Sequence, residues 1–155
     1  MTKPGLMRVD AVRGGIRAGI LGGGAEIAFI MAVAAASDIS AAGVARGISA
    51  SVGVAALPPA QLVFAGLLIH MALAIALGIA VAMACQALAG RLPHVIHVYA
   101  LVPVALIGVW AFNFLVLLPM INPAFVQLVP YPVSFISKLL FGLAAAESLR
   151  RSART

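Results

Sequence analysis

The chain has 155 residues, of which 64% are hydrophobic and only 9% are charged, whereas a soluble domain carries roughly 25% charged residues. So few polar side chains cannot cover a soluble domain of this length, and much of the surface must therefore face lipid. The formal net charge is +6, but the basic residues lie at the chain ends and beside apolar runs without a nucleic-acid-binding motif, so we expect no nucleic-acid partner. We expect residues 1–155 to form a single membrane domain in contact with the lipid bilayer.

The first apolar run, from about Ala18 to Ala36, has the length of a transmembrane helix. Basic residues before it and small residues near Ala36 imitate a signal peptide. The run is, however, about 19 residues long and is interrupted by Glu26, which a signal peptide would not carry. We therefore predict a retained first span.

The loop after this span, residues 37–59, is long enough to form structure of its own. Ser37 or Asp38 would cap a short helix, and Gly53 followed by two prolines would end it. Apolar residues recur every four positions between these signals, at Val44, Ile48 and Val52. We predict a short helix that lies on the membrane surface between spans one and two.

Three further segments are long and apolar enough to cross a membrane. They run from about Gln61 to Cys85, from about Val95 to Leu118 and from about Val133 to Leu149. Each should be helical because unpaired backbone groups are too costly in lipid. The predicted fold is an all-α integral membrane bundle of four transmembrane helices.

Four prolines lie between the third and fourth spans, at Pro119, Pro123, Pro130 and Pro132. A proline inside a helix removes an amide donor and clashes with the preceding turn, so we expect two crossings joined by a turn. Residues 119–132 carry no charge and are too apolar for an ordinary solvated loop. This segment should enter the interface, re-enter the bundle or be covered by another protein, with Phe125, Leu128 and Tyr131 facing the partner.

The basic residues predict the orientation of the bundle, because cytoplasmic loops are enriched in Lys and Arg. Arg46 alone lies in the loop between spans one and two, and Lys138 lies inside a span. The other eight fall on the side of the two termini: Lys3, Arg8, Arg13, Arg17, Arg91, Arg150, Arg151 and Arg154. We expect both termini in the cytoplasm, the short helix in the periplasm and the chain in a bacterial inner membrane.

Small residues recur at helical spacing in three spans and predict the faces on which the helices pack, since small side chains let backbones approach closely in lipid. An ionisable residue shares each face: Glu26 in span one, His70 in span two and Lys138 in span four. The glycines expected at helix contacts are Gly15, Gly19, Gly23, Gly66, Gly78 and Gly142. The same faces could instead serve self-association.

The polar residues inside the spans are predicted to lie in the outer half of the bundle. The helical rise places Glu26 and His70 about 15 Å from the outer end of their spans, and Asn113 and Lys138 about 8 Å from it. A cluster of these four residues is therefore possible. It would either hold the helices together by hydrogen bonds or form a proton, ion or ligand site.

No cofactor or metal is predicted. His94 and His97 share a helical face, but no third ligand is nearby in sequence, and a usual metal site needs three or four. A haem between His70 and His97 is disfavoured, because their depths should differ by roughly 20 Å. The single cysteine, Cys85, excludes an internal disulfide and a CxxC motif.

Two functions remain open from the sequence, and neither is enzymatic, because no nucleophile with a base or carboxylate pair has catalytic spacing. The first is a non-catalytic accessory subunit of a larger inner-membrane complex, respiratory or otherwise energy-converting. Its support is the small extramembrane mass and the apolar segment 119–132. The second is a small oligomeric channel or transporter that uses Glu26, His70 and Lys138.

Overall fold

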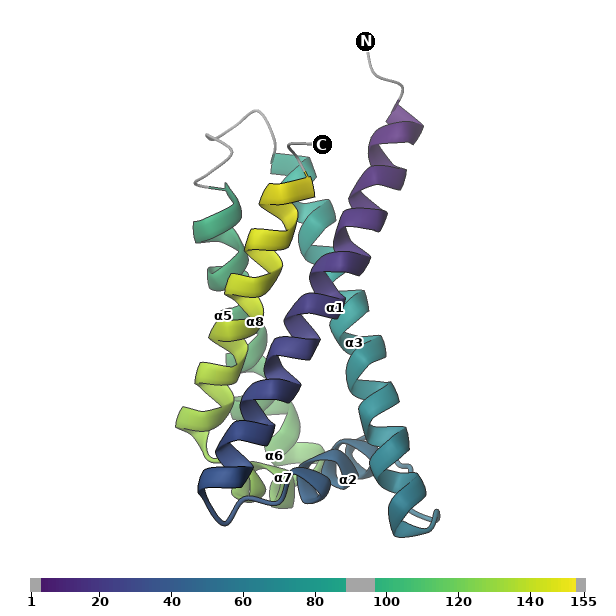
Figure 1. The fold of residues 1–155 in the computed structure, drawn as a ribbon, viewed down its shortest axis with the longest axis vertical. Helices are drawn as coiled ribbons and strands as arrows, with labels where there is room; N and C mark the ends of the chain where they lie inside the picture. The colour runs from purple at the N-terminus through teal and green to yellow at the C-terminus, as the bar shows by residue number, and fades with distance from the viewer. Residues whose placement is uncertain (1–3, 89–96, 153–155) are drawn as a thin grey trace.

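The computed structural model describes residues 4–88 and 97–152, and within these residues it is helical without any strand. Four long helical segments run up and down and are joined into one bundle (Figure 1). They are α1 (Pro4–Ala36), α3 (Pro59–Leu88), a third span of four successive pieces, and α8 (Tyr131–Ser152). The pieces of the third span are η1 (His97–Leu101), α5 (Val102–Phe112), η2 (Asn113–Leu117) and α6 (Leu118–Ile121).

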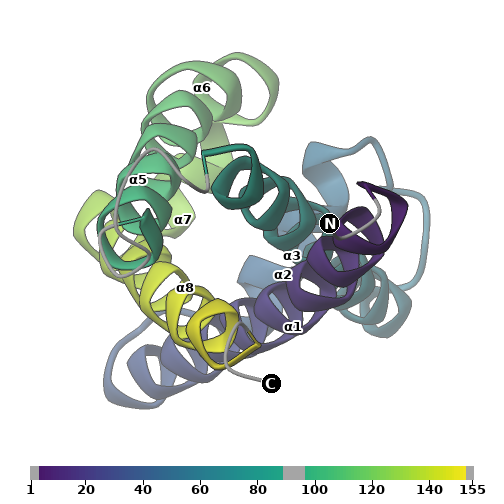
Figure 2. The same cartoon turned by 90° about the horizontal axis from the view of Figure 1, so that it is seen from above.

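Two short helices lie across one end of this bundle (Figure 1). They are α2 (Ala41–Ser51), which follows α1, and α7 (Pro123–Leu128), which follows the third span. The beginning of α1 and the end of α8 lie at the opposite end. Seen from above, α1 packs between α3 and α8, and α8 packs against α5 (Figure 2).

The prediction of four membrane-spanning helices is confirmed by length and composition. The helices long and apolar enough to span are Val9–Ala36, Pro59–Leu88, Val98–Ile121 and Tyr131–Ser152. Three of these are wider than the predicted spans by several residues at one or both ends. The 33 residues of α1 rise about 50 Å, whereas the hydrocarbon core is about 30 Å thick.

The third span contains two π-helical turns, and each ends two residues before a proline. η1 ends at Leu101 before Pro103, and η2 ends at Leu117 before Pro119. The amide of Leu118 bonds to the carbonyl of Asn113, five residues back, instead of four. This wider turn gives room to the proline ring, which would otherwise crowd the carbonyl four residues before it.

The predicted end of the third span at Leu118 is therefore corrected. Pro119 does not end the helix, which continues to Ile121, and the chain turns at Asn122. The side chain of Asn122 caps α7 by accepting a hydrogen bond from the amide of Phe125 at 3.2 Å.

The predicted short helix is present as α2, but its cap differs from the prediction. Ser40 caps it, accepting from the amide of Gly43 at 3.0 Å. The hydroxyl of Ser37 instead donates to the carbonyl of Val33 at the end of α1. Gly53 ends the helix region with a φ of +81°, a conformation that favours glycine. Its place on the periplasmic surface stays a prediction.

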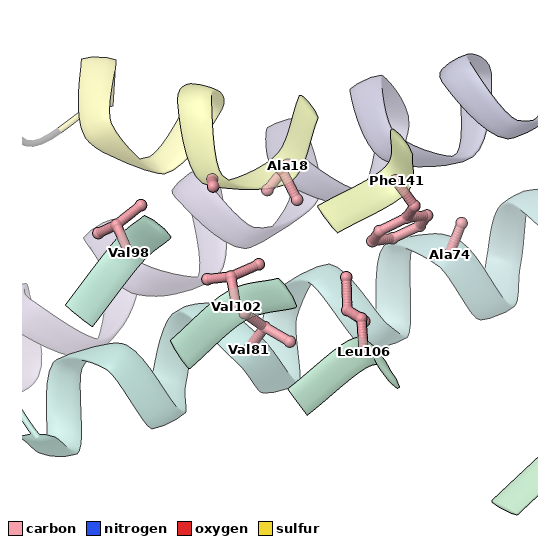
Figure 3. Packing of buried hydrophobic residues seen from close by; sticks show 9 residues of the cluster. Ala18, Ala74, Val81, Val98, Val102, Leu106 and Phe141 are labelled. Carbon is pink, nitrogen blue, oxygen red and sulfur yellow. The ribbon is translucent and has the colours of Figure 1, made fainter. Parts of the chain in front are cut away.

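The main apolar core lies between α1, α3, α8 and the third span (Figure 3). Phe141, Leu106 and Val102 are at most 1% exposed and come from α8 and α5. Small or branched residues of the other helices complete the cluster: Ala18, Ala74, Val81, Val98, Ala145 and Ala146.

The six glycines singled out in the sequence all lie at contacts between helices. A methyl group on Gly15, Gly19 or Gly78 would lie within 3.0 Å of the backbone of the facing helix, since α1 and α3 cross there. The other contacts are Gly23 against Ala74 of α3, Gly66 against the Ala45 carbonyl of α2, and Gly142 against Pro103 of α5.

Candidate functional site

Glu26 of α1 is buried, with 5% of its surface exposed, and faces α8. Its Oε1 atom lies 2.8 Å from the ammonium Nζ of Lys138. The same oxygen accepts a hydrogen bond from the Ser137 hydroxyl at 3.2 Å. A lysine and a hydroxyl from one helix therefore compensate the burial of a carboxylate from another.

His70 of α3 lies on the other side of this carboxylate. Its Nε2 atom is 3.8 Å from Glu26 Oε2, beyond ordinary hydrogen-bond distance, and 3.4 Å from the carbonyl oxygen of Gly23. The Lys138 ammonium also lies 5.1 Å from the ring centre of Phe141, in cation–π geometry. The structure thus brings Glu26, His70 and Lys138 together from three helices.

Asn113 is the first residue of η2 and faces the same region from the third span. Among the residues that the structure describes, its carboxamide makes no side-chain hydrogen bond. The fourth member of the predicted cluster is therefore close to the other three but is not bonded to them.

All four residues line one cavity of about 340 Å³. Small-molecule sites in proteins begin at about this volume, near 300 Å³. The remaining lining is mainly apolar and comes from every helical span, as well as from α2 and α7, with Ile30, Val44, Val109, Leu118 and Phe125 among it. The buried Phe141 lines the end of the cavity that faces the main core.

Trp110 and Ser134 also line this cavity, and sequence reasoning assigned neither a role there. The indole Nε1 of Trp110 donates to the Ser134 hydroxyl at 3.0 Å, which in turn donates to the Tyr131 carbonyl at 3.0 Å. Trp110 also stacks on Phe114, and the edge of Phe135 meets it at a centroid distance of 5.0 Å. In the sequence, the signal that could have found Ser134 is its position four residues, or about one helical turn, before Lys138.

The segment 119–132 was predicted to enter the interface, re-enter the bundle or be covered by another protein, and part of its cover comes from this chain itself. Phe125 is only 9% exposed and packs against Gly47 and Val44 of α2 within this chain. Leu128 is half-buried in the same cluster, whereas Tyr131 is 44% exposed. The pattern of apolar residues could not reveal that α2 folds back over them.

Asn122 connects this segment to α2 by hydrogen bonds. Its amide nitrogen donates to the Ser51 hydroxyl at 2.9 Å and to the Gly47 carbonyl at 3.3 Å. The Ser49 hydroxyl of α2 donates to the Leu62 carbonyl of α3 at 2.7 Å. Hydrogen bonds therefore hold α2 in place over the end of the cavity.

A second charged group lies near the other end of the bundle, on α8. Glu147 accepts hydrogen bonds from Arg150 and from Arg151, each at 2.7 Å, and from the hydroxyl of Tyr99. These groups are partly or fully exposed, and the Tyr99–Glu147 hydrogen bond joins η1 to α8 at the surface. None of them lines the cavity described above.

Within residues 4–88 and 97–152, no group of three or more His, Cys, Asp or Glu side chains is placed to hold a metal ion. His94 lies outside the described residues, and so does Arg91. The expectation that the protein uses no cofactor stays a prediction.

The fold and the site define a class: an all-helical, multi-pass membrane protein with a polar cluster inside its bundle. Comparison with protein-family models, curated proteins and solved structures gives no match for this chain. Its function is therefore argued from the site alone.

Proposed function

We propose that this chain is a non-enzymatic bacterial inner-membrane protein that binds a small molecule inside the bilayer, with both termini in the cytoplasm. The observation that carries the proposal is the cavity of about 340 Å³ lined by the buried Glu26, its half-buried partner Lys138, His70 and Asn113. Ionisable residues within a membrane are costly and mark binding or transport pathways by default.

This proposal is closer to the transporter alternative than to the accessory subunit. The subunit prediction rested on an apolar segment that needed a partner, and α2 of the same chain supplies much of that cover through Phe125 and Val44. An open channel through one copy is disfavoured, because Phe141, Leu106 and Val102 fill the bundle beyond the cavity. Binding of a molecule is the activity that the site supports best.

The test fills the cavity with a larger side chain and compares the small molecules that stay bound to each variant. Val109 of α5 lines the cavity, whereas Val104 of the same helix is 64% exposed and does not. Val109→Phe and Val104→Phe therefore add the same side chain inside and outside the site. Each protein is purified in mild detergent, checked for folding by circular dichroism, and extracted for mass spectrometry of bound small molecules.

We expect one small molecule to be retained near stoichiometric amount by the wild type and Val104→Phe, and to be lost from Val109→Phe. Retention of the same molecules by both folded variants would contradict the proposal. Co-purification of a stoichiometric membrane-protein partner, without any small molecule that depends on Val109, would instead support the accessory subunit.

A further inference from the structure

The polar groups that face the cavity retain hydrogen-bonding capacity. The Lys138 ammonium has three N–H donors, and its nitrogen lies 2.8 Å from Glu26 Oε1 and 5.1 Å from the centre of the Phe141 ring. At least one donor has no acceptor among the described residues, and the same holds for the carboxamide of Asn113. An occupant with an acceptor oxygen would satisfy both, since a donor that is half shielded from water and lacks a partner is unfavourable.

The charges of the site favour an occupant without net charge. The carboxylate of Glu26 and the ammonium of Lys138 compensate each other at 2.8 Å, and the only other ionisable group in the lining is His70. An ionic headgroup would bring an additional, uncompensated charge into a site of low dielectric constant. A carbonyl or hydroxyl oxygen of a neutral molecule meets the donors without that cost.

The cavity has an apolar rim on the side where α3 faces the third span. Leu73 of α3 and Ile121 of α6 both line the cavity, yet they are 60% and 52% exposed. Leu67 of α3 and Leu117 of η2 also line the cavity, and they are 39% and 37% exposed. All four belong to segments long and apolar enough to span a membrane, and Figure 2 shows α3 and α5 as neighbours around the ring, so this part of the opening would face lipid in a bilayer.

The end of the cavity that points away from the termini is partly covered by α2 and α7. Val44 of α2 and Phe125 are buried there, and the hydrogen bonds of Asn122 hold their helices together. An apolar chain therefore has a continuous route between the cavity and the bilayer, whereas a molecule dissolved in water would have to displace this cover.

We infer that the cavity takes a neutral amphipathic molecule from the bilayer, with a carbonyl-bearing headgroup against Lys138 and Asn113 and an apolar chain that leaves between α3 and the third span. This inference rests on the proposed function and specifies the ligand class and the entry route. Two sources share the required chemistry: a quinone ring on an apolar chain and the ester of an acylglycerol.

Trp110 offers a direct readout, because it is the single tryptophan of the chain and lines the cavity. The protein is placed in lipid nanodiscs and titrated either with a decyl benzoquinone or with a chain-brominated monoacylglycerol, both of which quench indole fluorescence on contact. The matched control moves the tryptophan to α3 as Trp110→Phe with Phe64→Trp, since Phe64 is 65% exposed and lies outside the cavity lining. That control measures quenching by probe dissolved in the bilayer.

We expect saturable quenching of Trp110 by one or both probes and linear quenching of the control. Val109→Phe should abolish the saturable phase. Asn113→Leu, and separately the charge-neutral double variant Glu26→Gln with Lys138→Met, should raise the half-saturation concentration by about tenfold, since each removes a hydrogen-bond donor. Saturation by the quinone alone assigns the quinone source, and saturation by the acylglycerol alone assigns the other.

Linear quenching of Trp110 by both probes, with the slope of the control, would overturn the inference. So would quenching by water-soluble acrylamide with no effect of either membrane probe, because the cavity would then open to water. If both probes fail while Val109→Phe still loses a retained molecule in the extraction experiment, the ligand class is wrong and the proposed function stands. If the extraction experiment also fails, both are wrong.

Discussion

At the scale of single residues, the contact between Glu26 and Lys138 dominates the energetics of the site. Among the described residues, Glu26 is the one charged residue that is buried, with 5% of its surface exposed. Removing one partner of a buried ion pair leaves an unpaired charge at a cost of about 3 to 5 kcal/mol, whereas replacing both partners by neutral groups is often tolerated.

Glu26→Gln and Lys138→Met should each lower the thermal unfolding midpoint in detergent. The double variant should lose less than the sum of the two single losses, because neither charge is then left alone. The expected coupling is about 1 to 3 kcal/mol, in the range measured for residues in direct contact. Losses that simply add would show that the two side chains do not interact in the folded protein.

At the scale of helices, close approach of α1 and α3 depends on positions without a side chain. Gly19 is buried, and a methyl group on it would lie within 3.0 Å of the backbone of Ala74 and Ile75. Gly24 of the same helix is exposed, with nothing within 4 Å of the corresponding position. The same substitution at each glycine therefore separates steric crowding between α1 and α3 from the change in helix propensity.

Gly19→Val should force α1 away from α3 and destabilise the bundle by about 1 to 3 kcal/mol or more, as overpacking does elsewhere. Gly24→Val should have a small effect, because its side chain would point into lipid. Thermal unfolding in detergent measures both. Equal effects of the two substitutions would mean that α1 and α3 do not meet at Gly19.

The cover formed by α2 and α7 depends on one asparagine. Asn122→Ala removes the hydrogen bonds to Ser51 and to the Gly47 carbonyl, at a cost of about 1 to 3 kcal/mol for the partners left unpaired. We expect faster limited proteolysis near residues 119–130 in this variant. Gln127→Ala, at an exposed position of α7, is the control and should leave the cleavage rate unchanged. Equal rates in the two variants would show that Asn122 does not hold the segment.

At the scale of the whole molecule, the orientation in the membrane follows from charge. The first residues of α1 and the last residues of α8 lie at one end of the bundle, and α2 with Arg46 lies at the other (Figure 1). Since Arg13 and Arg17 of α1 and Arg150 and Arg151 of α8 belong to the half of the bundle that carries these ends, the positive-inside rule predicts that this end is cytoplasmic.

Single-cysteine labelling in a Cys85→Ser background tests the orientation. Arg46 and Arg151 are both exposed and lie at opposite ends of the bundle, so each can be replaced by cysteine with little loss of stability. In intact cells, a membrane-impermeant maleimide should label Arg46→Cys and should reach Arg151→Cys only after the membrane is opened. The reverse pattern would overturn the predicted topology.

The sequence by itself determined the four helical spans, since long apolar runs in lipid must satisfy their backbone hydrogen bonds internally. It also singled out Glu26, His70 and Lys138 as candidates, because they stand out against apolar neighbours. Only the tertiary structure decided that these three meet and that Asn113 stays apart. It also decided that Pro119 remains inside a helix and that α2 covers Phe125. Those outcomes depend on the order of helices around the ring and on their rotation about their axes, which one-dimensional periodicity does not encode.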